Sequence, residues 1–286
     1  MDHRPEPWHA ALTAVAARSK PGRAVPTDAR LVLHFHPDSD LHGKPVLRRI
    51  LEEGRYASQF VTGTSNGGLT AVPGGDRWNW ESRLFSGAYD AHDGALRPAY
   101  GALNLDGDAY GAAPRFGSAY LRLRPEALRR ATFTYPDSAF EPALFGVADR
   151  MGLLDDYHAD VVDELLNRYI EAQVHGGVSV PDDVEAIVLD PSFDDEATLR
   201  VAEDAGLVIE RHPGYRLGLE TVEANPEYRG EEAVEVARRI AVDGMLTPAV
   251  VGRARVAGGI EPQLVKYVWH HLARFGREWP REAVAA

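Results

Sequence analysis

Residues 169–190 read YIEAQVHGGVSVPDDVEAIVLD, and this stretch predicts two strands joined by a loop. Successive side chains of a strand point to opposite faces, so apolar and polar residues are expected to separate here. The face expected to pack inward carries Ile170, Ala172 and Val174. The other face carries a phenol, an acid, an amide and an imidazole, from Tyr169, Glu171, Gln173 and His175. This polar row suggests the wall of a cleft, although a solvated face of an antiparallel sheet fits it equally.

The second half of the stretch predicts the return of a hairpin. Gly176, Gly177 and the pair Pro181-Asp182 mark the loop, and residues 184–189 predict a buried strand. We therefore expect the acid of this row to project from the first arm of a hairpin.

Composition and charge exclude several classes of protein. The chain has 286 residues, of which 44% are hydrophobic and 26% charged, with a formal net charge of -12. Phosphate contacts need clustered Lys and Arg, so the charge argues against a nucleic-acid partner and favours a basic or neutral one. Because the chain has no cysteine, a disulfide framework, a thiolate nucleophile and a cysteine zinc site are excluded.

The N-terminus lacks the apolar segment of a signal peptide, and no run approaches the roughly 20 apolar residues of a membrane span. We expect no membrane partner. The expected location is the cytoplasm, or the outside of the cell by a route that needs no cleaved signal peptide.

The first part of the chain predicts a helix, a strand and a second helix. The helix covers residues 8–18, and the strand covers residues 31–36 and ends at the pair Pro37-Asp38. The second helix covers residues 45–53, and Gly54 is suited to a left-handed cap. A strand-helix unit results, followed by a small polar segment at 59–69 whose amides and hydroxyls can hold a phosphate or ribose.

The later elements divide the chain in two. Three short strands are predicted at 100–105, 116–123 and 131–135, and they indicate an antiparallel sheet. Helices predicted at 142–151 and 154–168 form a helical insert at about 138–168. A C-terminal satellite at 194–286 is expected to contain a helix, two short strands and three more helices, at 195–205, 207–210, 215–219, 231–242, 248–257 and 262–275.

Two interpretations compete for the sequence His34-Phe-His36-Pro-Asp38. Both imidazoles lie on one face of the strand, as in metal-dependent hydrolases. That interpretation needs further ligands at later strand ends of a barrel, and the repeated strand-helix units of such a barrel are missing. A metal-dependent hydrolase using His34 and His36 is therefore the alternative interpretation.

The order of the predicted elements resembles the mono-ADP-ribosyltransferase fold. These elements are a strand with a terminal His, a helix, small Thr/Ser segments, Gly-x-Tyr turns and a late strand with Glu. The sequence RLVLHFH at 30–36 looks like the first strand of the diphtheria-toxin and poly-ADP-ribose-polymerase branch. In that branch a His followed by Gly holds the adenosine ribose of NAD, which implies this role for His36. Pro37 stands here in place of that Gly.

Other segments resemble further motifs of these enzymes. LFSGAY at 84–89 and FGSAY at 116–120 resemble the segment whose tyrosine stacks on nicotinamide, which implies that role for either Tyr89 or Tyr120. The segment from Thr62 to Ser65 and the segment TFT at 132–134 each look like the Ser-Thr-Ser strand of the toxin branch. The chain thus mixes features of two branches.

This mixture resembles the bacterial effector family of ubiquitin-specific threonine ADP-ribosyltransferases, which use an Asp and a Glu in catalysis. The resemblance covers roughly residues 30–193. It implies that Glu171 is the catalytic glutamate and that Asp38 is the aspartate, with Asp137 as the rival assignment. It also implies NAD as the cosubstrate, contacted by His36, Thr62, Ser65, Gln173 and one of the two tyrosines, and ubiquitin as the protein partner.

Breaking the bond between nicotinamide and ribose develops positive charge on the sugar, which a fixed carboxylate stabilises. Glu171 suits that role, and Asp38 would orient or deprotonate an acceptor hydroxyl. We expect an α+β enzyme with a split antiparallel β-sandwich at 1–193, and a satellite at 194–286 that can dock a protein substrate. A module that binds NAD or ubiquitin without turnover is a third possibility.

Overall fold

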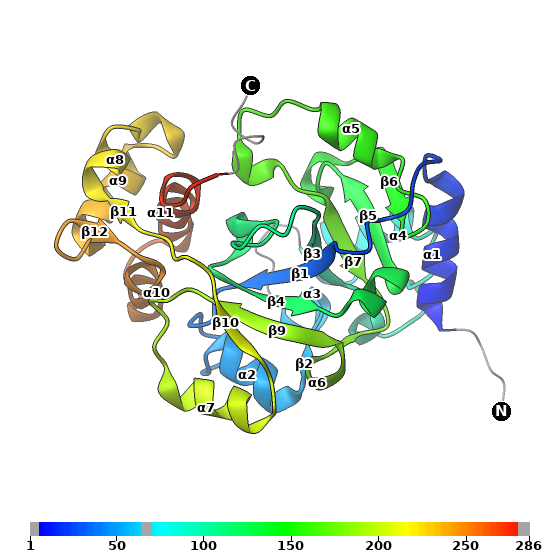
Figure 1. The fold of residues 1–286 in the computed structure, drawn as a ribbon, viewed down its shortest axis with the longest axis horizontal. Coiled ribbons are helices and arrows are strands. Elements are labelled where there is room, and N and C mark those ends of the chain that lie inside the picture. Colours follow the sequence, from blue (N-terminus) through cyan, green and yellow to red (C-terminus); the bar gives the residue numbers. More distant parts are fainter. Residues whose placement is uncertain (1–5, 64–69, 280–286) are drawn as a thin grey trace.

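The centre of the fold is one sheet of eight strands in the order β10-β9-β4-β1-β3-β7-β5-β6 (Figure 1). The computed structural model describes residues 6–63 and 70–279. The strands of this sheet are β1 (Arg30–Phe35), β3 (Ala99–Asn104), β4 (Ala119–Leu123), β5 (Ala131–Tyr135), β6 (Leu144–Val147), β7 (Glu171–Val174), β9 (Val184–Leu189) and β10 (Ile209–Arg211). All neighbours pair antiparallel except β9 and β10, which are parallel. The chain is therefore α+β, as its sequence predicts.

The sheet divides at β1. Only the first residues of this strand pair with β3, from Arg30 opposite Asn104 to Val32 opposite Ala102. The rest of β1, from Val32 to Phe35, pairs with β4 on its other side. The ladder between β1 and β3 ends at Val32. Beyond that residue it no longer joins the two halves of the sheet, β10-β9-β4-β1 and β3-β7-β5-β6, so polar side chains between the halves can face an open space.

Gly101 directly precedes Ala102, the residue of β3 that pairs with Val32. A Cβ there would lie 2.5 Å from the Val32 carbonyl oxygen and 2.5 Å from Leu33 Cδ2. We expect Gly101→Ala to push the half-sheets apart and to lower the free energy of unfolding by about 1–3 kcal/mol, the usual cost of overpacking. Urea denaturation measures this loss, and an unchanged midpoint would show that the two strands are free to separate.

The helices and short strands lie around this sheet. Those preceding the C-terminal region are α1 (Pro7–Arg18), α2 (Val46–Glu53), α3 (Gln59–Thr62), α4 (Asp76–Leu84), α5 (Leu153–Ala159) and α6 (Val180–Asp183), with β2 (Arg55–Tyr56) and β8 (Val178–Ser179). Gly54 caps α2 in the left-handed conformation with φ 63°, which confirms that prediction. The main core contains the predicted inward face of β7 and the residue before it, Ile170, Ala172 and Val174.

The helix predicted at 142–151 is wrong, and the helix predicted at 154–168 is wrong in part. Residues 144–147 form strand β6 and pair with β5, because the sheet edge offers backbone partners that override the local helical pattern. The second helix begins near the expected place but ends at Ala159, and only a short 3-10 turn follows at Leu165–Asn167. Val161, which the predicted helix would place on its apolar face with Leu154 and Leu165, is 69% exposed.

The predicted hairpin is also wrong. Strand β7 lies between β3 and β5, whereas β9 lies between β4 and β10, so the two arms belong to different half-sheets. The loop after Val174 therefore crosses from one half to the other, and it contains β8 and α6. Alternation along the chain gave the correct inward face of β7, but alternation carries no information on which strand is the neighbour.

The C-terminal region contributes to two cores. Helix α7 (Glu196–Asp204) and strand β10 join the main sheet, since Ala202 and Ile209 pack in its core. A second core contains Leu166 and, from Tyr215 onward, residues of the C-terminal region. Its elements are α8 (Leu219–Glu223), α9 (Glu231–Ile240), α10 (Pro248–Ala257), α11 (Pro262–Phe275) and the pair β11 (Leu217–Gly218) and β12 (Met245–Leu246). Figure 1 shows these helices at one side of the sheet. The satellite core thus begins about twenty residues after the boundary expected at 194.

No helix in the described ranges is long and apolar enough to cross a membrane.

Candidate active site

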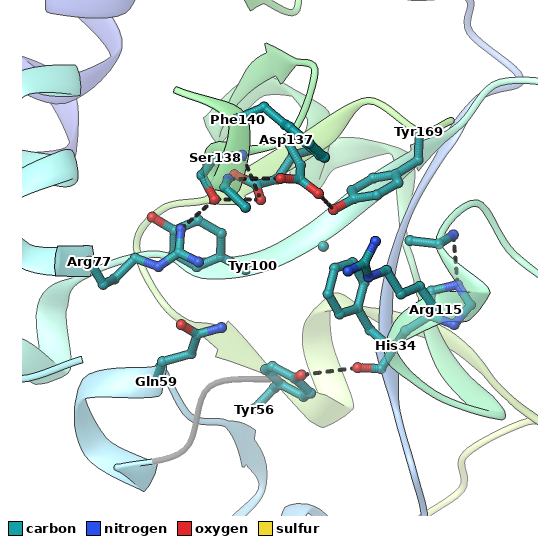
Figure 2. A pocket seen from close by; sticks show the side chains of 15 residues that line it. His34, Tyr56, Gln59, Arg77, Tyr100, Arg115, Asp137, Ser138, Phe140 and Tyr169 are labelled. Carbon is teal, nitrogen blue, oxygen red and sulfur yellow. Dashed lines mark hydrogen bonds between the residues drawn. The ribbon is translucent and has the colours of Figure 1, made fainter. Parts of the chain in front are cut away.

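A pocket of about 110 Å³ lies where β1 and β3 diverge (Figure 2). Its acids are Asp137 and Glu171, and its bases are Arg77 and Arg115. Aromatic rings form much of the remaining wall, from Tyr56, Tyr100, Phe116, Phe140 and Tyr169. Carboxylates, guanidinium groups and flat rings around one small space are typical of a ligand site rather than a solvated sheet face.

Glu171 stands at the first position of β7 and is almost fully buried, with 6% exposure. Its Oε2 accepts hydrogen bonds from the Ser138 hydroxyl at 2.8 Å and from the Ser138 backbone N–H at 3.4 Å. Its Oε1 accepts from Gln173 Nε2 at 3.0 Å. Burial raises the pKa of Glu171, and the nearby positive charge of Arg77 offsets part of that increase. The carboxyl group is thus held in one orientation at the wall of the pocket.

Asp137 is the second carboxylate of this pocket. It follows β5 and accepts the backbone N–H of Ala139 at 2.8 Å, so it caps the 3-10 turn Ser138–Phe140. Its other oxygen accepts a hydrogen bond from the Tyr169 hydroxyl, as the dashed line in Figure 2 shows. The negative charge of Asp137 is one of the causes that raise the pKa of Glu171, so the two acids interact.

Asp38, which the sequence favours as the partner of Glu171, does not line this pocket. Strand β1 ends at Phe35, and the chain then turns toward the satellite. There the Asp38 carboxylate lies 3.8 Å from Arg255 and packs so closely on Gly252 that a Cβ at this glycine would overlap it. The structure therefore brings Asp137, the rival assignment, together with Glu171 instead of Asp38.

His34 of β1 and His36, which directly follows β1, reach different places. His34 lines the pocket, donates from Nδ1 to the Gly117 carbonyl at 3.2 Å, and accepts the Ala113 N–H at Nε2 over 3.2 Å. Burial lowers the pKa of His34 to about 3, so the ring is neutral. His36 packs edge-on against Trp269, with ring centroids 4.9 Å apart. Among the described residues, no three His, Cys, Asp or Glu side chains are grouped so that they can hold a metal ion.

A second pocket of about 290 Å³ adjoins the first and shares Tyr56, Gln59 and Tyr100 with it. The sequence-predicted residues His36 and Thr62 line this second pocket. Its basic lining residues are Arg49, Arg55 and Arg255. Ser65 lies outside the described residues. Of the residues predicted to contact NAD, His36 and Thr62 thus line the neighbouring pocket, and none in the described ranges lines the pocket of Glu171.

Three other predicted residues are buried and do not line the first pocket. Tyr89 donates its hydroxyl to His175 Nδ1 at 2.7 Å, and Tyr120 donates to the Ala109 carbonyl at 2.9 Å while its ring packs against His34. Gln173 has no exposed surface and contacts Glu171. Neither of the tyrosines expected to stack on nicotinamide faces the pocket, and Tyr100 from β3 is one of the rings that do.

The two arginines of the pocket were missed from the sequence. Arg77 of α4 lies 4.1 Å above the Tyr100 ring and donates to the Ser138 hydroxyl at 2.7 Å. Its Nε has no hydrogen-bond partner in the described part of the chain. Arg115 donates to the Asn167 side chain and pairs with no carboxylate among residues 6–63 and 70–279. No local pattern distinguishes these arginines from the other basic residues, since only the tertiary fold brings them beside Glu171.

Comparisons with known proteins give one curated relative and one family. The chain is 30% identical over 173 residues to "Gene 2 protein" of Mycobacterium phage D29, a match that covers 52% of this chain and 62% of that protein. The chain thus spans about three fifths of the length of this relative. The profile described as "Protein of unknown function (DUF3626)" matches residues 30–154 and 148–275, which include the whole pocket. The chain belongs to the DUF3626 family.

Proposed function

We propose that this protein is an NAD-dependent mono-ADP-ribosyltransferase that transfers ADP-ribose to a protein hydroxyl, a threonine of ubiquitin, with release of nicotinamide. The observation that carries the proposal is the position of Glu171 at the start of a strand bordering the division of the sheet, buried and hydrogen-bonded in a pocket with arginines and aromatic rings. A split sheet with a late catalytic glutamate is also what the resemblance to ADP-ribosyltransferases implies.

Glu171 would act on the ribose. When the bond between the ribose carbon and the nicotinamide nitrogen breaks, its electron pair leaves with nicotinamide and the sugar becomes cationic. A carboxylate whose hydrogen bonds already fix its direction stabilises that charge without rearranging. The Ser138 and Gln173 bonds to Glu171 supply this preorganisation.

The charges of the cleft support an anionic cosubstrate such as NAD. The whole chain is acidic, with a formal net charge of -12. The two adjoining pockets instead carry more arginines than acids: Arg49, Arg55, Arg77, Arg115 and Arg255 against Asp40, Glu53, Asp137 and Glu171. Guanidinium groups bind phosphate oxygens well because their donors match them in pairs. The smaller pocket suits a single ring beside Glu171, and the larger one suits the rest of a dinucleotide.

Asp137 takes the role of the second acid in this proposal. The acceptor oxygen forms the new bond to the ribose carbon and loses its proton, and Asp137 is the carboxylate beside Glu171 that can receive it. We expect Asp137→Asn to lower the rate of transfer by about 10²–10⁴-fold, the usual contribution of a general base. Asp38→Asn is the matched variant outside this pocket and is expected to change the rate far less, since it touches only Arg255 of the second pocket. A large loss in Asp38→Asn with activity retained in Asp137→Asn would reverse the assignment.

The function is tested by incubating the protein with ubiquitin and NAD labelled in the adenylate, with and without a chelator. Label on ubiquitin that is insensitive to the chelator supports the proposal. Free ADP-ribose without labelled ubiquitin would keep NAD as the substrate and reject ubiquitin as the acceptor. Bound but uncleaved NAD would identify a module without turnover, and loss of activity with the chelator would favour the metal-dependent alternative.

A further inference from the structure

A continuous row of buried side chains leads away from Glu171 along the polar face of β7. It consists of Gln173, Thr132, His175 and Tyr89, and none of the four lines the pocket. We propose that Thr132, His175 and Tyr89 are positioning residues that act through Gln173, by fixing which end of its amide faces the Glu171 carboxylate. This inference rests on the proposed function for its effect on rate, but its structural part can be tested without turnover.

The hydrogen bonds of Gln173 define the orientation of its amide. Its Nε2 donates to Glu171 Oε1 at 3.0 Å and to the Thr134 hydroxyl at 3.3 Å. Its Oε1 accepts from the Thr132 hydroxyl at 2.8 Å. A carboxylate can only accept, so this orientation gives ionised Glu171 a donor, and the Thr132 hydroxyl holds the amide in it from the other end.

The direction of the remaining bonds follows from this orientation. The only proton of the Thr132 hydroxyl is donated to Gln173, so the hydroxyl oxygen accepts from His175 Nε2 at 3.1 Å. His175 then carries its proton on Nε2, and its Nδ1 accepts the Tyr89 hydroxyl at 2.7 Å. Burial, with the charge of Arg130 as a further cause, lowers the pKa of His175 to about 3, so the ring stays neutral. Every donor in the row therefore points toward Glu171.

Burial makes the direction of the row hard to reverse. Gln173, Thr132 and His175 have no exposed surface and Tyr89 has almost none, so water cannot replace a lost partner. If the amide turned over, two acceptors, Gln173 Oε1 and Glu171 Oε1, would face each other, and Glu171 Oε1 would lose the N–H that donates to it at 3.0 Å. Leaving a buried polar group unpaired costs about 1–3 kcal/mol, which is enough to hold one orientation.

Other groups that face Glu171 come from every element around it. They are Arg77 of α4, Asp137 and Ser138 after β5, Tyr169 before β7 and Tyr100 of β3. Arg77, Ser138 and Gln173 lower the pKa of Glu171, whereas burial and Asp137 raise it. Loss of the Gln173 N–H therefore removes one of the stabilising contacts of the ionised carboxylate and leaves the others in place.

Thr132→Val and Thr132→Ser form the test pair, because valine keeps the shape and removes the hydroxyl while serine keeps the hydroxyl. The titration of Glu171 is followed by infrared difference spectroscopy of the carboxyl stretch, with Glu171→Gln subtracted to identify its band. We expect Thr132→Val to raise the titration midpoint by about one pH unit, the usual effect of a lost hydrogen bond to a carboxylate. Thr132→Ser is expected to keep the wild-type midpoint.

Turnover gives a second readout. In Thr132→Val we expect kcat to fall about tenfold at pH values below the titration midpoint of Glu171, with KM unchanged, because a midpoint raised by about one pH unit leaves about a tenth of the ionised carboxylate there. Tyr89→Phe, which removes the donor farthest from Glu171, is expected to move the midpoint in the same direction by less. It serves as the second variant if Thr132→Val does not fold by circular dichroism.

Equal midpoints in wild type, Thr132→Val and Tyr89→Phe would overturn the positioning role. The two proposals fail separately. A raised midpoint in a protein that does not cleave NAD would leave the positioning role intact and reject the proposed function. NAD cleavage with no difference in midpoint or kcat between Thr132→Val and Thr132→Ser would support the proposed function and reject the positioning role.

Discussion

Glu171→Gln is expected to reduce the transfer of ADP-ribose from NAD by about 10²–10³-fold, the effect of removing one preorganised electrostatic contact to a transition state. Glutamine keeps the shape of the side chain and an oxygen that can accept the Ser138 hydroxyl, whereas its nitrogen faces Gln173 Nε2, so the Gln173 contact is lost together with the charge. The lost negative charge is the one that would face the ribose cation. The measurement is label transfer at saturating NAD, beside the affinity for NAD in the absence of turnover.

The pH dependence of the wild-type enzyme gives an independent check on the same residue. Burial raises the pKa of Glu171 above the ordinary value of 4.5 for a glutamate, and only the ionised form stabilises a cation. The rate is therefore expected to fall as the pH decreases through this raised value, and the acid limb should be absent from the residual activity of Glu171→Gln. Glu203→Gln, on the exposed surface of α7, is the control that should retain the wild-type rate. A variant of Glu171 with full activity would remove the basis of the proposed function.

The sequence predicted best those elements whose signals are local. Strands at 131–135 and 184–189 and helices at 248–257 and 262–275 agree with β5, β9, α10 and α11, because turn residues and prolines mark their ends. It failed where the partner strand decides the structure. Four residues, 144–147, are too short a stretch for hydrophobic periodicity to distinguish a strand from a helix. Their pairing with β5 makes them a strand.

The candidate site was predicted in the same uneven way. Alternation along β7 gave the polar row correctly, and the row proved to have two parts. Tyr169 and Glu171 line the pocket, whereas Gln173 and His175 continue into a buried network. Periodicity cannot separate these parts, because both lie on one face and differ only in what covers them.

The choice between Asp38 and Asp137 shows the limit more sharply. Both acids follow a strand and a proline, so their local sequences do not distinguish which of them accompanies Glu171. The register places Thr134, close to Asp137, opposite Glu171 on the neighbouring strand, whereas β1 is not a neighbour of β7 in the sheet order. Long-range pairing alone therefore decides which carboxylate meets Glu171.

At about pH 8, where Glu81 is ionised, Arg97→Met is expected to lower the free energy of unfolding by about 3–5 kcal/mol, the effect of removing one partner of a buried ion pair. The side chains of Arg97 and Glu81 have no exposed surface, and Arg97 Nη1 lies 2.6 Å from Glu81 Oε2. The other oxygen of Glu81 accepts the Tyr100 hydroxyl at 2.8 Å, so this pair also supports a ring of the pocket wall. Methionine restores part of the lost volume, and the main deficit is a carboxyl group left without its cation.

The loss in Arg97→Met should depend on pH, with a sign that identifies Glu81 as its cause. Burial raises the pKa of Glu81 from 4.5 to about 7, so between these values the native state binds a proton that the unfolded state does not. The stabilising contribution of this protonation is complete below pH 4.5 and disappears as the pH rises through about 7. Without the positive charge of Arg97 the pKa of Glu81 rises further, so urea denaturation should show a larger loss at about pH 8 than at about pH 5. Glu81→Gln combined with Arg97→Met should recover most of that difference, and an equal loss at both pH values would mean that packing, not the unpaired acid, controls the stability here.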